Sequence, residues 1–415
     1  MAEPNATTTR IPAVEAAVAA YGFPPPPDWS TYSGRSEVTI CDMNSAIAGF
    51  NINGSVEPPV MVALDATRVL IYYRNVTTSL GYLVVGTVSD TGITFGTPID
   101  GGFTNGGATV QMALIGTDKV LMTYYDAANN TKAVVSTIAG TVPSVGAHVA
   151  VVTGSAAETV VCALNTDVAA VVAFTTNTNQ GNSYILTVAG TVITVNANTT
   201  FEAAASGWNG VRIAKLTTTS FAVLVGIAGG ATRLIIASVA GTTITFGADS
   251  VVCGGILAHY NGDQMFLVAL SATKVIFGIG SNTDFTNSFG QATIAGTTIS
   301  GVGNYNPLIQ LKGMHAVGLS ATTAMLIATA QLDYSASYAV YPMVVAMLTA
   351  DTTAQPLTPA LTHMHFGPEN FLYAGGLVNN GTVMTIVALS ATRLLSLVGV
   401  KMGTGMFPKI ILHKL

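Results

Sequence analysis

Residues that could do chemistry are few and scattered in this sequence. Of the six histidines, only His363 and His365 stand two positions apart, where a strand would place both on one face, and two imidazoles make a weak metal site. The acidic residues occur singly, whereas glycoside hydrolysis needs a convergent pair of carboxyl groups. No nucleophile elbow, zinc-protease motif, phosphate-binding loop or dinucleotide fingerprint occurs. We therefore predict no catalytic residue, no metal ligand and no cofactor.

Composition points away from a nucleic-acid-binding surface and from a membrane span. Only 8% of the 415 residues are charged and the net charge is −5, with no run of Lys or Arg to neutralise phosphates. No uncharged apolar run is long enough to cross a membrane, and no secretory signal is visible. The three cysteines are far apart and favour buried free thiols. Solubility must come from Thr, Ser, Asn and Gly, a pattern that suits a rigid β-protein in a large assembly.

A repeat near 50 residues organises the chain. In each repeat a short apolar run ends in a leucine, enters a polar turn and restarts as a β-rich run. The leucines are Leu64, Leu114, Leu164, Leu216, Leu270, Leu319 and Leu389, at spacings of 50, 50, 52, 54, 49 and 70. This period with β-forming residues is typical of propeller blades.

The first repeat divides into four expected strands, at 60–64, 68–74, 80–88 and 93–99. Short turns between them predict an antiparallel blade. The turn before the fourth strand reads Ala-Gly-Thr in later repeats, at Gly140, Gly190, Gly241 and Gly296. A glycine there supplies a positive φ without steric cost.

The two ends of the array predict how the ring closes. After Leu389 only two strand-like runs remain, 393–400 and 406–413, so the last repeat lacks one strand. Segment 37–42 is a strand candidate before the first repeat, and we predict that it completes the last blade and removes the open edges. The predicted fold is an all-β, seven-bladed β-propeller of four-stranded antiparallel blades, closed by this N-terminal strand. Residues 36–415 form the propeller, with an insertion around 350–378.

Residues 1–35 are predicted to form a separate arm. Pro12 suits the first turn of a short helix that ends near Tyr21, and four prolines then impose an extended stretch. A helix this short needs a surface to dock on, either a neighbouring chain or its own propeller. For the first alternative the candidate partner-docking residues are Pro12, Tyr21, Phe23, Pro24, Pro25, Pro26, Pro27 and Trp29.

The insertion is predicted to be a long loop, which is where surface contacts usually reside. Its candidate surface-recognition residues are His363, His365, Phe366, Asn370, Phe371 and Tyr373. Two tyrosine pairs, Tyr72–Tyr73 and Tyr124–Tyr125, recur in register and indicate either packing between blades or a platform for sugar rings. The segment around Asp90 partly resembles the Asp-box turn of sialidase-like propellers, which is a structural element.

The phrases Ala-Leu-Ser-Ala-Thr-(Arg/Lys) and Ala-Gly-Thr-Thr-Ile-Thr resemble the repeats of propeller-containing virion proteins of tailed bacteriophages, over about residues 36–415. The resemblance implies a structural virion protein, a tail or head-appendage component of tail-fibre, nozzle or hub type. It implies assembly in many copies on other tail or portal-region proteins, localisation in the virion, and contact with the host surface. A lectin-like propeller that binds a host surface glycan is the first alternative, and a glycan-cleaving propeller enzyme is the second.

Overall fold

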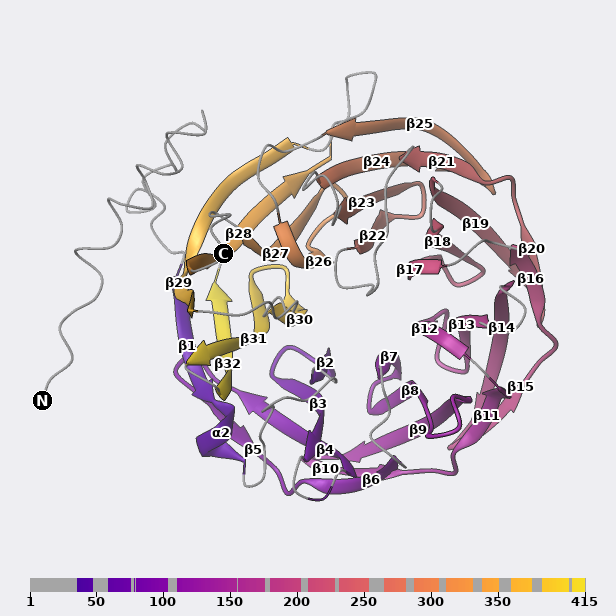
Figure 1. The fold of residues 1–415 in the computed structure, drawn as a ribbon. Coiled ribbons are helices and arrows are strands. Elements are labelled where there is room, and N and C mark those ends of the chain that lie inside the picture. The colour runs from indigo at the N-terminus through magenta and orange to yellow at the C-terminus, as the bar shows by residue number, and fades with distance from the viewer. Residues whose placement is uncertain are drawn as a thin grey trace, which may run out of the picture.

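The strands form seven antiparallel sheets that stand side by side around a ring, so the chain is an all-β propeller (Figure 1). The only helix among the described residues is the four-residue α2 (Met43–Ala46). The computed structural model describes residues 36–47, 59–75, 78, 80–103, 110–154, 156–175, 180–202, 208–227, 231–253, 265–280, 287–305, 311–330, 338–350, 360–374, 383–402 and 405–414.

Sheets 1 to 4 share one plan, in which the third strand pairs with two short outer strands. Sheet 1 contains β2 (Val60–Ala63), β3 (Arg68–Asn75), β4 (Leu80–Val88), β5 (Ile93–Phe95) and β6 (Ile99–Phe103). Sheet 2 contains β7 (Gln111–Gly116), β8 (Lys119–Tyr125), β9 (Thr131–Ala139), β10 (Val142–Val145) and β11 (Val149–Val152). Sheet 3 contains β12 (Ala156–Ala163), β13 (Val168–Thr175), β14 (Gln180–Ala189), β15 (Val192–Val195) and β16 (Thr199–Glu202). Sheet 4 contains β17 (Trp208–Thr217), β18 (Ser220–Ile227), β19 (Thr232–Ala240), β20 (Thr243–Phe246) and β21 (Ser250–Cys253).

Sheets 5 to 7 are four-stranded. Sheet 5 contains β22 (Met265–Ser271), β23 (Lys274–Gly280), β24 (Asn287–Ala295) and β25 (Thr298–Tyr305). Sheet 6 contains β26 (Leu311–Gly318), β27 (Thr323–Ala330), β28 (Tyr338–Thr349) and β29 (Ala360–Ala374). Sheet 7 contains β30 (Val383–Ser390), β31 (Arg393–Met402), β32 (Gly405–Lys414) and, from the other end of the chain, β1 (Ser36–Asp42).

The first strand of each sheet lies on the inside of the ring. These strands contact one another in the cyclic order β2, β7, β12, β17, β22, β26, β30 and back to β2. Figure 1 shows them around the centre, with the later strands of each sheet farther out. Consecutive sheets along the chain are therefore neighbours in space, and the last sheet lies against the first.

The predicted closure by the N-terminal strand is confirmed. β1 pairs antiparallel with β32, with Glu37 opposite His413 and Val38 opposite Leu412 (Figure 1). Sheet 7 thus has the order β1-β32-β31-β30, and the strand from the start of the described chain is its outer strand. Because no peptide bond joins β1 to β32, hydrogen bonds and packing alone seal the ring at this sheet.

The continuous fourth strand predicted at 93–99 is wrong, because the chain bulges there. Residues 96–98 stand opposite only two residues of β4, and the same extra residue recurs in sheets 2, 3 and 4. A Cβ on Gly96 would collide with the carbonyl oxygen of Thr141 in the next sheet, and one on Gly247 would collide with that of Thr297. In sheets 1 and 4 the bulge therefore brings the outer edge so close to the next sheet's turn that only a residue without a side chain fits. In sheet 3 Asn196 holds this place, and its side-chain amide donates to the carbonyl of Ile185.

The predicted positive φ of the turn glycines is confirmed, at 63°, 65°, 62° and 60° for Gly140, Gly190, Gly241 and Gly296.

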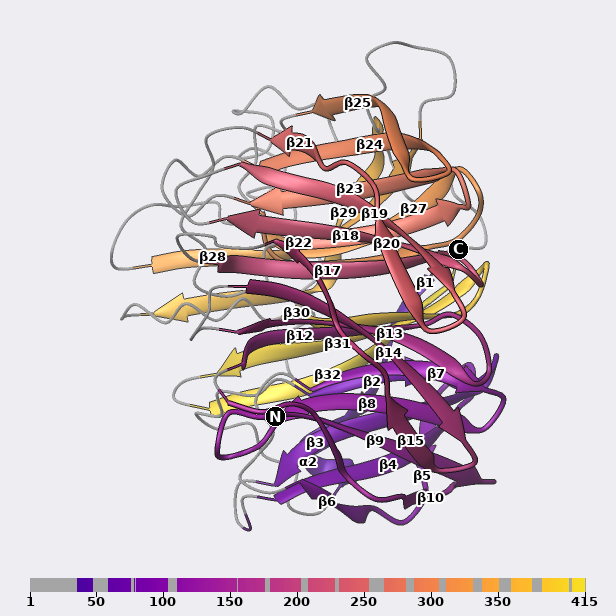
Figure 2. The same cartoon turned by 90° about the vertical axis from the view of Figure 1, so that its right-hand side faces the viewer.

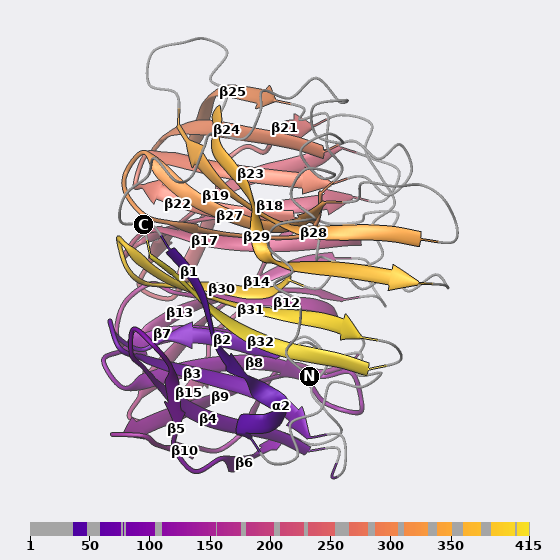
Figure 3. The same ribbon diagram turned by 90° about the vertical axis from the view of Figure 1, so that its left-hand side faces the viewer.

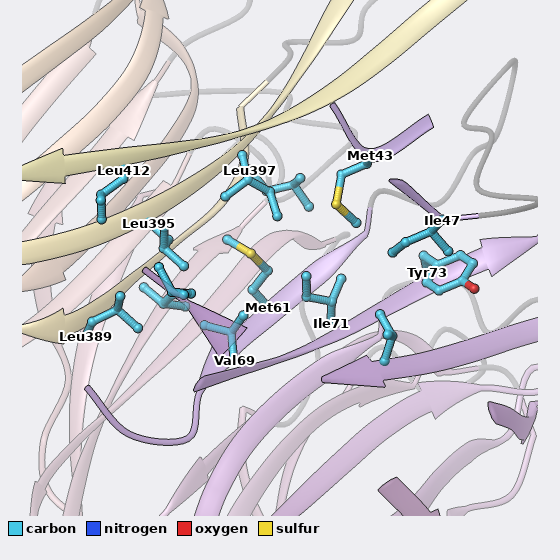
Figure 4. Packing of buried hydrophobic residues seen from close by; sticks show 14 residues of the cluster. Met43, Ile47, Met61, Val69, Ile71, Tyr73, Leu389, Leu395, Leu397 and Leu412 are labelled. Carbon is cyan, nitrogen blue, oxygen red and sulfur yellow. The ribbon is translucent and has the colours of Figure 1, made fainter. Parts of the chain in front are cut away.

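The hydrophobic core is divided among the interfaces between neighbouring sheets, and seven clusters of buried residues occur in the described part of the chain. The cluster between sheets 7 and 1 also takes in Met43 and Ile47, at the start of α2 and just after it (Figure 4). Met43 is 0% exposed and Ile47 is 3% exposed. The segment that follows β1 therefore adds apolar side chains to the interface where the ring closes.

The expected loop in the insertion is instead a strand for most of its described length. β29 pairs with β28 from Ala374 opposite Tyr338 to Ala360 opposite Thr349, with a bulge around Gly367–Glu369. Alternating β-forming residues and the long partner strand explain the pairing, and a proline is tolerated because it lies at a bulge in an edge strand. In the side views, β28 and β29 extend beyond the ends of neighbouring strands (Figures 2 and 3).

Candidate functional site

The two groups of sequence-predicted site residues have different outcomes. His363, His365, Phe366, Asn370, Phe371 and Tyr373 all lie on β29 and not on a loop. His365 stands opposite Val345 and Phe366 opposite Val344, which places this group on the outer strand of sheet 6. The partner-docking residues from Pro12 to Trp29 lie outside the described residues.

The tyrosine pairs are packing residues, and a sugar platform at these positions is wrong. Tyr72, Tyr73 and Tyr124 are at most 2% exposed. Phe103 contacts both Tyr72 and Tyr124 edge-on, at ring-centroid distances of 5.1 and 4.8 Å. These rings fill the interface between sheets 1 and 2, where an external sugar has no access.

Ionised groups join neighbouring sheets at the turn between the first two strands of sheets 1, 2 and 7. Asp65 Oδ1 accepts hydrogen bonds from the backbone N–H groups of Thr67 and Arg68, each at 2.8 Å, and Oδ2 lies 2.6 Å from Arg68 Nε. Desolvation raises the pKa of Asp65, but the hydrogen bonds from Arg68 and Thr67 outweigh it and lower the pKa to about 2. The Asp65 carboxylate therefore stays ionised and holds the guanidinium of Arg68 in place.

Arg68 extends this contact to the next sheet. Its Nη2 lies 2.7 Å from Asp118 Oδ1, and its Nη1 donates to the carbonyl oxygen of Gly140 at 2.9 Å. Both acceptors belong to turns of sheet 2. One repeat later Lys119 Nζ lies 4.0 Å from Asp167 in sheet 3, a longer and weaker version of the same contact. The basic residue that starts the second strand thus reaches the first turn of the following sheet.

The basic residue that starts the second strand also joins sheet 7 to sheet 1, where the ring closes. Arg393 donates to the carbonyl oxygen of Ala66 at 3.2 Å, and its Nη2 lies 3.2 Å from Asp90 Oδ1. Lys414, from β32, lies 3.2 Å from Asp90 Oδ2. Asp90 is the acid of the Asp-box-like turn, and its role in the ring closure is one that sequence reasoning missed. The recurring Arg or Lys after Ala-Leu-Ser-Ala-Thr is the sequence feature from which this contact could have been predicted.

Two further polar contacts cross sheet boundaries. His148 Nε2 lies 3.0 Å from the carbonyl oxygen of Gly101 in sheet 1, so this nitrogen donates, and Tyr124 O–H then donates to Nδ1 at 2.6 Å. Burial lowers the pKa of His148, which favours this neutral ring. Arg212 in sheet 4 pairs with Glu158 in sheet 3 at 3.0 Å, and its Nε donates to the carbonyl of Met265 in sheet 5 at 2.9 Å.

These groups are arranged to hold sheets together. Five basic side chains contact a partner on a neighbouring sheet, namely Arg68, Lys119, Arg212, Arg393 and Lys414. Asp65 holds Arg68 in place for its contact, and the His148 ring is fixed at both nitrogens. Burial raises the pKa of the free Cys162 thiol to about 12, which disfavours a thiolate. The described residues contain no group of three or more potential metal ligands, and none of their helices is long and apolar enough to span a membrane.

Comparison with known proteins gives distant structural matches. No protein-family model and no curated protein sequence matches the chain. Among solved structures, AofleA from Arthrobotrys oligospora is 10% identical with a TM-score of 0.44, covering 83% of this chain and 94% of its own. The SapL1 lectin in complex with alpha methyl fucoside is 12% identical with a TM-score of 0.42, covering 76% and 98%. The β-propeller domain of the Trilobed protease from Pyrococcus furiosus is 8% identical with a TM-score of 0.44, covering 86% and 94%.

Proposed function

We propose that this chain is a non-enzymatic structural protein whose seven sheets are the blades of one closed propeller. The cyclic contacts of the inner strands and the pairing of β1 with β32 support the closed ring. The seven apolar clusters, one at each interface, support blades that are held on both faces.

The main observation in support of this proposal is that ion pairs join neighbouring sheets. Arg68 binds Asp118 in the next sheet, and Arg393 and Lys414 both bind Asp90 across the closure. In a chain with only 8% charged residues, these groups serve the cohesion of the ring. A ring whose neighbouring sheets are joined by ion pairs suits a structural subunit that transmits force within an assembly.

We infer that the assembly is the virion of a tailed bacteriophage, because of the repeated phrases described above. Residues 1–35 are the proposed docking arm, and tail or portal-region proteins are its partners. Mass spectrometry of purified particles from a phage that encodes this chain should detect it in many copies. Its absence from intact particles would refute the virion role.

Deleting residues 1–30 tests the arm separately. The deletion leaves Ser36, the first residue of β1, in place, so the ring should fold and remain soluble but fail to enter particles. Thr218→Ala, in an exposed turn of sheet 4, is the control and should enter normally. Normal incorporation of the truncated chain would show that docking lies elsewhere.

The extended hairpin β28–β29 favours a second candidate, a lectin-like propeller that binds a host surface glycan. Its strands have 12 and 15 residues and extend beyond their neighbours (Figure 3). The predicted recognition residues lie on its outer strand. A glycan array probed with the full chain, with and without calcium, should show a signal that His365→Ala with Phe371→Ala abolishes. A blank array under both conditions would count against this candidate.

A further inference from the structure

Three buried hydroxyl groups face the interface between sheets 2 and 3. Thr123, Thr131 and Thr159 are each 0% exposed, and their Oγ1 atoms have no hydrogen-bond partner among the described residues. A buried hydroxyl without a partner is costly, about 1–3 kcal/mol, so native proteins seldom leave one unsatisfied.

All three side chains belong to the same interface. Leu121 on β8, and Ala133 and Val135 on β9, pack in the cluster between sheets 2 and 3. The register of these two strands is regular from Lys119 to Tyr125, so Thr123 and Thr131 share that face. On β12 Val161 belongs to the same cluster, and the regular register from Glu158 to Ala163 places Thr159 on the face toward sheet 2.

The residues opposite Thr123 and Thr159 are small. Thr123 pairs with Ala133, and Thr159 pairs with Ala173, so each hydroxyl has a methyl-sized neighbour on its own sheet. Both alanines are 0% exposed and lie in the shared cluster. β8 and β12 are in contact across the interface. Small residues beside several hydroxyls are the kind of surroundings in which an internal water binds.

Packing alone does not require hydroxyls here. Thr123 is the fifth residue of the second strand, and the fifth residues of the corresponding strands β13, β18 and β27 are Val172, Leu224 and Ile327. Thr159 stands five residues before its repeat leucine, where sheets 4 and 5 have Val211 and Met265. Valine has nearly the shape of threonine, so the oxygen atoms must serve some purpose other than filling volume.

We propose that the interface between sheets 2 and 3 holds a built-in hydration site, in which at least one long-lived water bridges Thr159 of sheet 3 to Thr123 and Thr131 of sheet 2. The water accepts from or donates to each hydroxyl, at positions where several other interfaces have an apolar side chain. The interface between sheets 2 and 3 is then joined partly through solvent.

The test combines a crystal structure of the full chain with oxygen-17 relaxation dispersion, which counts waters that stay bound for longer than the protein tumbles. The map should show a peak within about 3 Å of Thr123 Oγ1 and Thr159 Oγ1. Thr123→Val and Thr159→Val should each lower the long-lived water count by one. Ser183→Ala is the matched control, because its hydroxyl is also buried but donates to the carbonyl oxygen of Val171, and it should leave the count unchanged.

The electron-density map of the wild-type protein tests the proposal even if a variant fails to fold. A clear map with no peak between these hydroxyls, or with protein atoms as their hydrogen-bond partners, overturns the proposal. An unchanged water count in both folded threonine variants overturns it as well.

Discussion

Met43→Ala is the sharpest perturbation of the ring closure. Met43 is 0% exposed and packs with side chains of sheets 7 and 1, including Tyr73 and Leu397 (Figure 4). Truncating a buried methionine to alanine costs about 2–5 kcal/mol, and we take about 3 kcal/mol for a site enclosed by two sheets. The unfolding entropy of about 2.1 cal/mol/K per residue, over about 380 residues, gives about 0.8 kcal/mol/K, so the melting temperature should fall by about 4 °C.

The assay must separate global loss of stability from local opening of the closure. Thermal unfolding followed by circular dichroism gives the first. Amide hydrogen exchange over β1, residues 36–42, gives the second, because only hydrogen bonds and packing hold β1 on β32. Met122→Ala is the matched control, since Met122 is also 0% exposed but lies between sheets 1 and 2.

Both variants should melt earlier, but only Met43→Ala should speed exchange in β1 beyond what the change in global stability explains. A melting temperature within about 1 °C of wild type, with unchanged protection of β1, would refute the reasoning that the segment after β1 helps to seal the ring.

Three further predictions concern single contacts. Gly96→Ala should lower stability by about 1–3 kcal/mol in urea, because its Cβ would meet the carbonyl of Thr141, whereas Gly92→Ala, with open space around it, should be nearly neutral; equal effects would contradict the close approach. The pKa of Asp65 is lowered to about 2, so the stability that it contributes is present above about pH 4 and is lost as the pH falls toward 2. Because its side chain is 37% exposed, we expect Asp65→Asn to cost about 1 kcal/mol at pH 7, a difference that shrinks in acid denaturation series; a constant difference would count against the ion pair. Tyr124→Phe removes the hydrogen bond to His148 and should cost about 1 kcal/mol, read from the urea midpoint, and no change would mean that the bond is not formed in solution.

Local patterns in the sequence were sufficient to predict much of the propeller. The repeat leucines located the first hairpin of each sheet, and the turn glycines have the expected positive φ. The strand at 37–42 was identified as the missing outer strand, because the last repeat was one strand short. These features depend on residues close together in the chain or on counting, so sequence alone reveals them.

The tertiary structure decided which atoms meet across the boundaries between sheets. Asp90 and Arg393 are 303 positions apart and become partners only because the ring closes. The residues next to either one in the sequence do not predict the other as its partner. The outer-strand bulges depend on a turn of the next sheet, and β29 became a strand because β28 was long enough to pair with it. Backbone period and turn chemistry are local properties that the sequence determines directly, whereas contacts between sheets exist only after the whole circle has formed, since each sheet's neighbour is set by that closure.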